Sequence, residues 1–218
     1  MNSPTAALRR SPEERERDPE ATRANILEIA TAEFAEKGFS GARVDDIAAR
    51  TDTSKRMIYY YFGDKEGLFV AVLEEAYARI RAIENALDLD HLAPEKAMAR
   101  LAGVTFDYHT ANPDFVRLVM VENIHEGVHL KQSRVIHDVN VTVIEAIGRL
   151  YERGQAEGVF RKGLDPIDIH MSMSALAFHN VSNRSTFALV FERDMTSPEA
   201  LARRRAIVVE TILRYVKA

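Results

Sequence analysis

The chain has 218 residues, of which 46% are hydrophobic and 28% are charged, a balance typical of a soluble globular protein. It contains no cysteine, which excludes a disulfide scaffold and a thiolate metal site. The net charge of −4 does not by itself indicate a nucleic-acid-binding protein, so such a function must rest on local arrangement.

The N-terminal segment is rich in charge and lacks apolar periodicity, which predicts a disordered arm over residues 1–18. It also lacks the apolar stretch of a signal peptide. The longest charge-free run, residues 169–183, is too short to cross a bilayer and predicts a buried helix. We therefore expect a cytoplasmic protein with no membrane partner.

The first helix is predicted to begin at Asp18 and Pro19, an N-cap residue followed by proline at the first helical position. Apolar residues then recur at helical spacing. Gly38 is expected to end this helix with a positive φ, which glycine adopts at little cost. Phe39 would then contact Phe34.

Two short helices joined by a tight turn are predicted over residues 43–62, which is the geometry of a helix-turn-helix. Thr53 or Ser54 can cap the second of them, and Gly63 ends it. Asp64 is the expected cap of the long helix that follows. In such a unit the second helix enters the major groove of DNA with its N-terminal residues.

The positions of the cations support this interpretation. Lys55 and Arg56 occupy the first turn of the second helix, where the helix dipole disfavours positive charge. Lys65 repeats this arrangement in the next helix, where an ammonium and free backbone amides suit a phosphate. The tyrosines at 59–61 project about 100° apart around a helix, so at least one is exposed. The alternative is an ordinary amphipathic helix with a solvated charge pair.

The remaining two thirds of the chain show several more apolar helical segments. Proline marks four of their starts, at Pro94, Pro113, Pro166 and Pro198. No stretch alternates between apolar and polar residues, so no sheet is expected. The predicted fold class is all-α.

A set of residues with defined spacing runs through positions 30–73. Its members are Gly38-Phe39, Ile47-Ala48, Ser54, Tyr59, Phe62, Lys65-Glu66 and Leu68. This segment resembles the DNA-binding domain of the TetR family of bacterial transcriptional repressors. The match covers about residues 20–75 without gaps, and the rest of the chain resembles the family in helical architecture and length.

The resemblance implies a ligand-responsive transcriptional regulator, expected to be a repressor and not an enzyme, with no cofactor. A homodimer would bind a palindromic operator in double-stranded DNA and be released by a small-molecule effector. The expected organisation is a disordered arm at 1–18, a DNA-binding domain at 19–65 and a helical regulatory and dimerisation domain at 66–218. When bound to DNA, the protein would be associated with the nucleoid.

The resemblance also implies which residues contact DNA. Those implied to read bases, or to lie beside the base-reading residues, are Ser54, Lys55, Arg56 and Tyr60. Those implied to contact phosphates are Arg43, Tyr59 and Lys65. Tyr61 is compatible with either role. Asp52 departs from the family, which usually has glycine in this turn, but aspartate tolerates left-handed backbone better than most residues.

The second half would contain the effector pocket and the dimer interface. The inward-facing candidates for the pocket are Met98, Phe106, His109, Phe115, Met120, His125, Val143, Ile147, Met173 and Phe178, each of which is also compatible with plain core. In the family, the last two helices pack against those of the partner. The expected interface residues are Leu176, Val181, Phe187, Leu201, Val208, Ile212 and Tyr215. Arg203, Arg204 and Arg205 are interpreted as a solvated face or as interface salt bridges.

One motif points elsewhere, because His125, Glu126 and His129 match the zinc-binding pattern H-E-x-x-H. A zinc-dependent hydrolase needs a third ligand, and the extended pattern is broken by Gln132 and Val135. A zinc-dependent helical hydrolase is therefore the minor alternative, and a metal-sensing regulator is a milder one. The expected assignment has no metal site and no catalytic residue.

Overall fold

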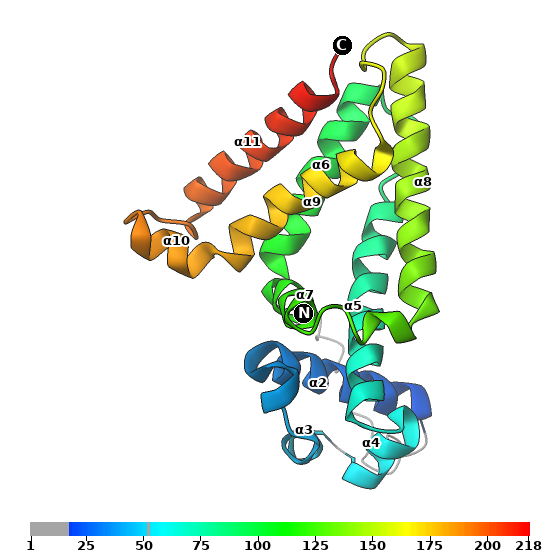
Figure 1. The fold of residues 1–218 in the computed structure, drawn as a ribbon, viewed down its shortest axis with the longest axis vertical. Helices are drawn as coiled ribbons and strands as arrows, with labels where there is room; N and C mark the ends of the chain where they lie inside the picture. The colour runs from blue at the N-terminus through cyan, green and yellow to red at the C-terminus, as the bar shows by residue number, and fades with distance from the viewer. Residues whose placement is uncertain (1–17, 52) are drawn as a thin grey trace, which may run out of the picture. The chain divides into compact units, whose positions relative to one another are not determined.

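The computed structural model describes residues 18–51 and 53–218, so most of the predicted arm and Asp52 lie outside the described residues. The described chain is helical, with an isolated β-bridge between Phe160 and Lys217, which confirms the all-α prediction (Figure 1). The helices of the N-terminal half are α2 (Pro19–Gly41), α3 (Val44–Arg50), α4 (Lys55–Phe62) and α5 (Lys65–Asn85). Those that follow are α6 (Pro94–Ala111), α7 (Pro113–Ile124), a 3-10 turn η1 (Leu130–Gln132), α8 (Arg134–Ala156), α9 (Pro166–Ser182), α10 (Arg184–Val190) and α11 (Pro198–Val216).

The chain divides into two compact units, one up to Val72 and the other from Leu73 onward. The division falls inside α5, later than the boundary predicted between residues 65 and 66. All four helices predicted to start at proline do so. Among the described residues, no helix has the length and apolar character that crossing a membrane requires.

In the N-terminal unit, α2 begins as predicted. The Asp18 carboxylate accepts hydrogen bonds from the backbone N–H groups of Glu20 and Ala21, both at 3.1 Å. The predicted end at Gly38 is confirmed for the regular part of α2, because Gly38 has non-helical φ and ψ, and a further helical segment follows this kink up to Gly41. Gly38 has φ of 70° and ψ of 174°, so the expectation of a positive φ is confirmed.

An aromatic cluster fills the interior of this unit. The rings of Phe34 and Phe39 stack with centroids 6.3 Å apart, which confirms the predicted contact. Phe69 of α5 lies 4.9 Å from Phe34 and 5.3 Å from Phe39. This cluster joins α5 to α2.

A buried carboxylate also positions α3. Glu33 is 1% exposed, and its oxygens lie 2.8 Å from the Lys37 ammonium and 3.3 Å from the Arg50 guanidinium. The same carboxylate accepts a hydrogen bond from the backbone N–H of Arg43 at 3.4 Å. Because Arg43 precedes α3 and Arg50 ends it, Glu33 holds both ends of that helix against α2.

In the C-terminal unit, α6 packs against α8, α9 and α11 (Figure 1). The main core is formed by side chains from these helices, among them Met98, Leu101, Ile147, Met173 and Ile212. A smaller cluster joins Phe106, Ala177 and Val208. Helices α9 and α11 therefore each bury one face within their own chain.

Candidate DNA-binding surface and ligand sites

Helix α4 is capped at both ends and anchored by one side chain. The Ser54 hydroxyl accepts a hydrogen bond from the backbone N–H of Met57 at 3.3 Å, so Ser54 is the N-cap. Ile58 is completely buried, and Gly63 ends the helix with φ of 78°. Tyr60 is 78% exposed, which confirms that the tyrosine run cannot be buried as a whole.

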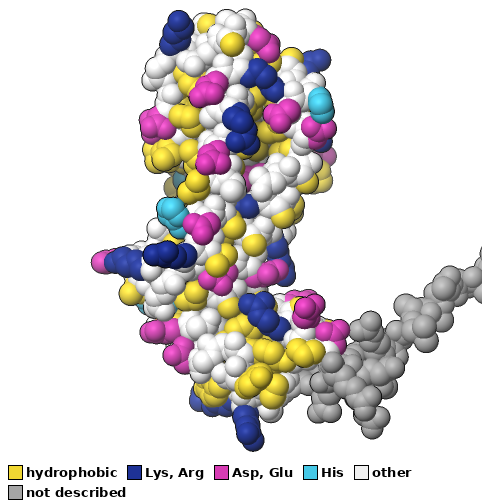
Figure 2. All heavy atoms as spheres, turned by 90° about the vertical axis from the view of Figure 1, so that its right-hand side faces the viewer, with side chains coloured by type: hydrophobic (Ala, Val, Ile, Leu, Met, Phe, Trp, Pro, Cys, Tyr) yellow, Lys and Arg dark blue, Asp and Glu magenta, His cyan; other side chains and the backbone are white. Residues whose placement is uncertain are grey.

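The exposed face of α4 and its flanks carries the predicted DNA-contacting residues. Arg43, Ser54, Lys55, Arg56, Tyr59 and Tyr60 are exposed, and Tyr61 and Lys65 are half-buried. Figure 2 shows Lys and Arg side chains beside hydrophobic ones, a class that includes tyrosine, on the N-terminal unit. Cationic and aromatic groups on one face are the types that contact phosphates and base edges.

Two of the cations have partners that the sequence did not indicate. The Lys55 ammonium lies 2.8 Å from the Asp45 carboxylate, whose hydrogen bond raises the pKa of Lys55. The Lys65 ammonium lies 4.9 Å from the centre of the Phe39 ring and donates to the Ser40 carbonyl at 3.5 Å. Partial burial lowers the pKa of Lys65. Arg43 is the N-cap residue of α3, and its side chain makes no capping hydrogen bond.

The predicted pocket residues other than His125, which is half-buried at the end of α7, separate into three groups. Met98, Phe106, Val143 and Ile147 are buried in the core clusters. Met120 is 37% exposed and stays a prediction. His109, Phe115, Met173 and Phe178 surround a buried polar cluster. The His109 ring lies 5.5 Å from that of Phe115 and 6.4 Å from that of Phe178.

This polar cluster contains an ion pair that the sequence analysis missed. Arg81 and Glu84 of α5 are both 6% exposed and paired with each other, and the Thr105 hydroxyl lies 3.5 Å from Glu84 Oε1. Burial raises the pKa of Glu84, against the opposing effect of Arg81. Arg81 Nε is buried and has no hydrogen-bond acceptor. In the sequence, the two charges look like an ordinary surface pair three residues apart.

Two histidines lie beside this pair in their neutral forms at pH 7. His109 Nδ1 lies 2.7 Å from the Thr105 carbonyl, so Nδ1 carries the proton and Nε2 is left as an acceptor. Burial lowers the pKa of His109. Burial also lowers the pKa of His170 to about 4, with smaller contributions from the charges of Arg81 and His109.

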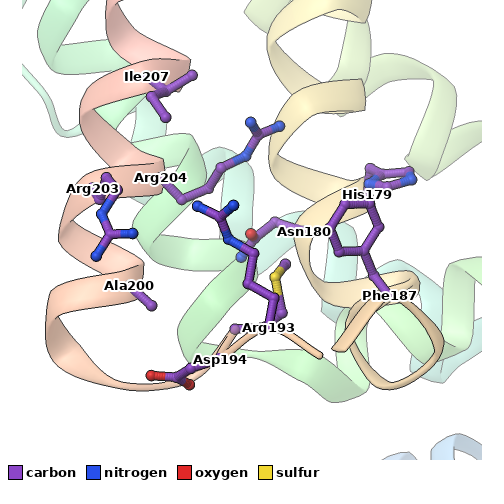
Figure 3. Close-up of a pocket in the computed structure, with 10 residues that line it drawn as sticks. His179, Asn180, Phe187, Arg193, Asp194, Ala200, Arg203, Arg204 and Ile207 are labelled. Atoms are coloured by element: carbon purple, nitrogen blue, oxygen red, sulfur yellow. The ribbon is translucent and has the colours of Figure 1, made fainter. Parts of the chain in front are cut away.

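A cavity of about 450 Å³ opens between α9, α10 and α11 (Figure 3). Its lining residues are His179, Asn180, Phe187, Arg193, Asp194, Met195, Ala200, Arg203, Arg204 and Ile207. Of these, Phe187 alone was a predicted site residue, and it was assigned to the dimer interface. The cavity forms where the chain turns from α10 into α11, a juxtaposition that no local pattern encodes.

The arrangement of helices and the sequence both match known proteins. Residues 26–72 match the model of the bacterial regulatory proteins of the tetR family, and residues 94–212 match the tetracyclin repressor-like C-terminal domain. The chain is 33% identical over 203 residues to the HTH-type transcriptional repressor NicS of Pseudomonas putida, covering 93% of this chain and 96% of NicS. The chain belongs to the TetR family.

Two further comparisons agree with this TetR-family assignment. Over 111 residues the chain is 44% identical to the HTH-type transcriptional repressor SCO4008 of Streptomyces coelicolor. This alignment covers 51% of this chain and 54% of SCO4008. The crystal structure of the putative transcriptional regulator SCO4942 from the same organism superimposes with a TM-score of 0.67 at 26% identity. That match covers 89% of this chain and 98% of SCO4942. TetR-family regulators bind operator DNA and act as dimers.

Within this TetR-family chain, the predicted dimer-interface residues do not share one environment. Val208 and Ile212 are 0% and 1% exposed and lie in the cores of their own chain, so assigning them to the interface was wrong. Helical periodicity identified the apolar stripe of α11, but α6 and α9 already cover it. Leu176, Val181, Phe187, Leu201 and Tyr215 are half-buried and stay predictions.

The HEGVH motif lies in a turn between α7 and η1 and not on a helix. Glu126 and Gly127 both have positive φ, 56° and 71°, so the one-turn helical spacing that the zinc pattern needs is missing. The His129 ring instead lies 2.7 Å from the Glu122 carboxylate, which also accepts the backbone N–H of His129. Within the described ranges, no three His, Asp or Glu side chains gather as a metal site requires.

Proposed function

We propose that this chain is a homodimeric repressor that binds a palindromic operator through α3 and α4 and is released by a small-molecule effector. The observation that carries this proposal is the exposed surface of α4, where Lys55, Arg56 and Tyr60 project from the helix that ends a helix-turn-helix. NicS, which aligns over nearly the whole chain, is named a repressor. The present chain would bind DNA and would not catalyse a reaction. It would act in the cytoplasm, where operator DNA lies.

The proposed contacts divide between bases and phosphates. Lys55, Arg56 and Tyr60 would reach base edges in the major groove, because they lie on the first two turns of α4. Arg43 and Tyr59 would contact phosphates on either side. Lys65 would reach a phosphate only by leaving the Phe39 ring.

We place the effector beside the buried polar cluster of the C-terminal unit. Arg81 Nε offers a donor without an acceptor, and His109 Nε2 offers an acceptor. Phe115 and Phe178 supply aromatic walls. An effector with both a hydrogen-bond donor and an acceptor on an apolar frame fits these groups, since buried polar groups favour partners that satisfy them.

Helix α5 would connect effector binding to DNA binding. It begins with Lys65 in the N-terminal unit and carries the Arg81–Glu84 pair in the C-terminal unit. An effector that prefers one arrangement of that pair would shift the population of α5 conformations. Release then follows if the preferred conformation holds the two recognition helices of the dimer at a spacing that does not fit the operator.

Fluorescence anisotropy with labelled duplexes from upstream of the protein's own gene and its neighbour tests this function. We expect saturable binding that weakens steeply with salt, and a strong loss in Tyr60→Ala with an unchanged melting temperature, because Tyr60 is 78% exposed. Absence of binding to every duplex at low salt, or a monomer at all concentrations, contradicts the proposal. Matched random duplexes provide the control for specificity.

A further inference from the structure

The buried ion pair of Arg81 and Glu84 uses only part of the Arg81 guanidinium. Arg81 Nη1 donates to Glu84 Oε2, and both residues are 6% exposed. Arg81 Nε is also buried, and within the described ranges it has no hydrogen-bond acceptor. Such a donor is costly, because it has lost its water without gaining a partner. The Nε edge of Arg81 therefore favours the binding of an acceptor.

The histidines near this ion pair do not compete with Arg81 for an anion, because both are neutral at pH 7. His109 of α6 donates its Nδ1–H group to the Thr105 carbonyl at 2.7 Å, and burial lowers its pKa. The pKa of His170 of α9 is about 4, chiefly through burial. Arg81 is therefore the positive charge of this cluster at pH 7.

The other polar groups around Glu84 are also uncharged or already paired. The Thr105 hydroxyl lies 3.5 Å from Glu84 Oε1. Burial raises the pKa of the phenols of Tyr77 and Tyr108, so both keep their protons. The charge of Glu122 of α7 also acts on Tyr77, but this carboxylate lies 2.7 Å from the His129 ring and is used there.

The surroundings of the cluster are rich in aromatic rings that meet edge to face. The Phe115 ring lies 5.7 Å from that of Tyr108 and 5.5 Å from that of His109. The Phe178 ring lies 6.4 Å from the His109 ring on α6, which packs against α9 (Figure 1). Aromatic walls of this kind suit a ligand with a flat, apolar body.

A carboxylate is the acceptor that best fits the free edge of Arg81, since it can accept two parallel N–H groups of one guanidinium. The guanidinium would then lie between the ligand carboxylate and that of Glu84. Two carboxylates that share one site cannot both stay ionised, so one of them binds a proton. Burial raises the pKa of Glu84, which makes Glu84 the group that takes this proton.

We propose that the effector site binds an aromatic carboxylic acid through the Nε edge of Arg81, and that Glu84 takes up one proton from the solvent during binding. The inference rests on the effector site proposed above and adds the class of ligand and its dependence on pH. The charges balance, because the free ion pair is neutral overall. The complex of guanidinium, ligand carboxylate and protonated Glu84 is neutral as well.

Isothermal titration calorimetry of the full chain tests the proposal with benzoate, phenylacetate and 4-hydroxybenzoate, each compared with its uncharged amide. The hydroxyl of 4-hydroxybenzoate offers a donor to His109 Nε2. We expect at least one acid to bind at millimolar concentration or below, and its amide to bind at least about tenfold more weakly.

The same titrations count protons. Because one proton enters with the acid, affinity should be about tenfold lower at pH 8 than at pH 7. Titrations in phosphate and in Tris, which differ in enthalpy of ionisation, should give an uptake of about one proton per bound acid. This measurement uses the wild type, so it stays decisive if a variant does not fold.

Two variants identify the groups involved. Glu84→Gln should take up no proton, bind the acid equally at pH 7 and pH 8, and bind it at least about tenfold more tightly than the wild type at pH 8. Arg81→Lys keeps the positive charge but lacks the Nε edge, so it should bind the acid about tenfold more weakly. The matched controls are Glu75→Gln and Arg79→Lys, an exposed ion pair on the same helix, and both should behave like the wild type.

Three results overturn the inference: none of the acids binds to the wild type or to Glu84→Gln at millimolar concentration, the amides bind as well as the acids, or proton uptake is the same in Glu84→Gln. The last result would mean that His109 or His170 takes the proton. Operator binding is measured in parallel without acid. Operator binding by a chain that binds none of the acids contradicts this inference alone, whereas absence of operator binding contradicts the repressor function.

Discussion

The ammonium of Lys55 and the carboxylate of Asp45 lie 2.8 Å apart, which ties the first turn of α4 to the first turn of α3. Both side chains are substantially exposed, so the pair contributes little to stability. Its consequence is functional, because a cation proposed to read DNA is held beside a carboxylate that DNA phosphates would repel. When the protein binds DNA, either Lys55 breaks its ion pair with Asp45, or the intact ion pair lies against the DNA.

We expect Asp45→Asn to tighten DNA binding severalfold, since it frees Lys55 and removes a negative charge from the proposed DNA face. Anisotropy at low salt measures the change. Asp168→Asn, which also removes an exposed first-turn carboxylate but from α9, provides the control and should leave affinity unchanged. Weaker binding by Asp45→Asn would mean that Asp45 positions Lys55 for base contact.

Replacing Lys65 with alanine should weaken binding to specific and random duplexes by the same factor, because a phosphate contact carries no sequence information. The slope of log affinity against log salt should become shallower by about one. Lys162→Ala, an exposed lysine of the C-terminal unit, should change neither quantity. An unchanged slope in Lys65→Ala would show that Lys65 does not contact a phosphate and has only its structural contacts with Phe39 and Ser40.

Glu33→Gln should lower the free energy of unfolding by about 1.5–3 kcal/mol, because charge-assisted hydrogen bonds to Arg50 and Lys37 are lost from a buried site. Urea denaturation measures this loss. Glu36→Gln, three residues along α2 and exposed, is the matched control with an expected change near zero. Equal stability of the two variants would show that the ion pairs of Glu33 with Arg50 and Lys37 contribute little to the free energy of unfolding, because both cations remain exposed to water.

The stability of the chain should fall as pH drops from about 6.5 towards 4. His170 has a folded-state pKa of about 4, below its unfolded value, so the unfolded chain binds more protons in this window. The free energy of unfolding of His170→Gln should therefore fall by about 3 kcal/mol less than that of the wild type between pH 6.5 and pH 4. Glu84, whose pKa is raised, acts in the opposite direction and is present in both proteins.

Urea midpoints at a series of pH values measure this difference, and His137→Gln provides the control because that side chain is 76% exposed. If the urea midpoints of the wild type and of His170→Gln fall by the same amount as pH drops, the acid sensitivity of the chain comes from other groups.

The N-terminal unit was largely predictable because its signals are local. A cap at Asp18, a serine before α4 and glycines with positive φ each act within a few residues, so their effect is visible in the sequence. Gly38 interrupts the helix with a positive φ as predicted, and the helical segment that follows it to Gly41 was not expected. The pairing of Lys55 with Asp45 depends on the angle between two helices, which composition does not specify.

In the C-terminal unit, the packing of the helices depends on residues that lie far apart in the sequence. Periodicity identified apolar stripes on α9 and α11 but could not say whether this chain or a partner covers them, and Val208 and Ile212 turned out to be covered by their own chain. Arg81 and Glu84 have the spacing of surface charges in the sequence, but both are buried in the folded chain, where the Thr105 hydroxyl of α6 lies 3.5 Å from Glu84.

The sequence by itself determined the helices, their caps and the identity of the helix-turn-helix, because those features depend on backbone preferences and on residues close in the chain. Tertiary structure alone decided which charges are buried and which apolar faces the chain itself covers. Burial and Coulomb interaction depend on distances between residues far apart in sequence, such as Glu84 of α5 and Thr105 of α6.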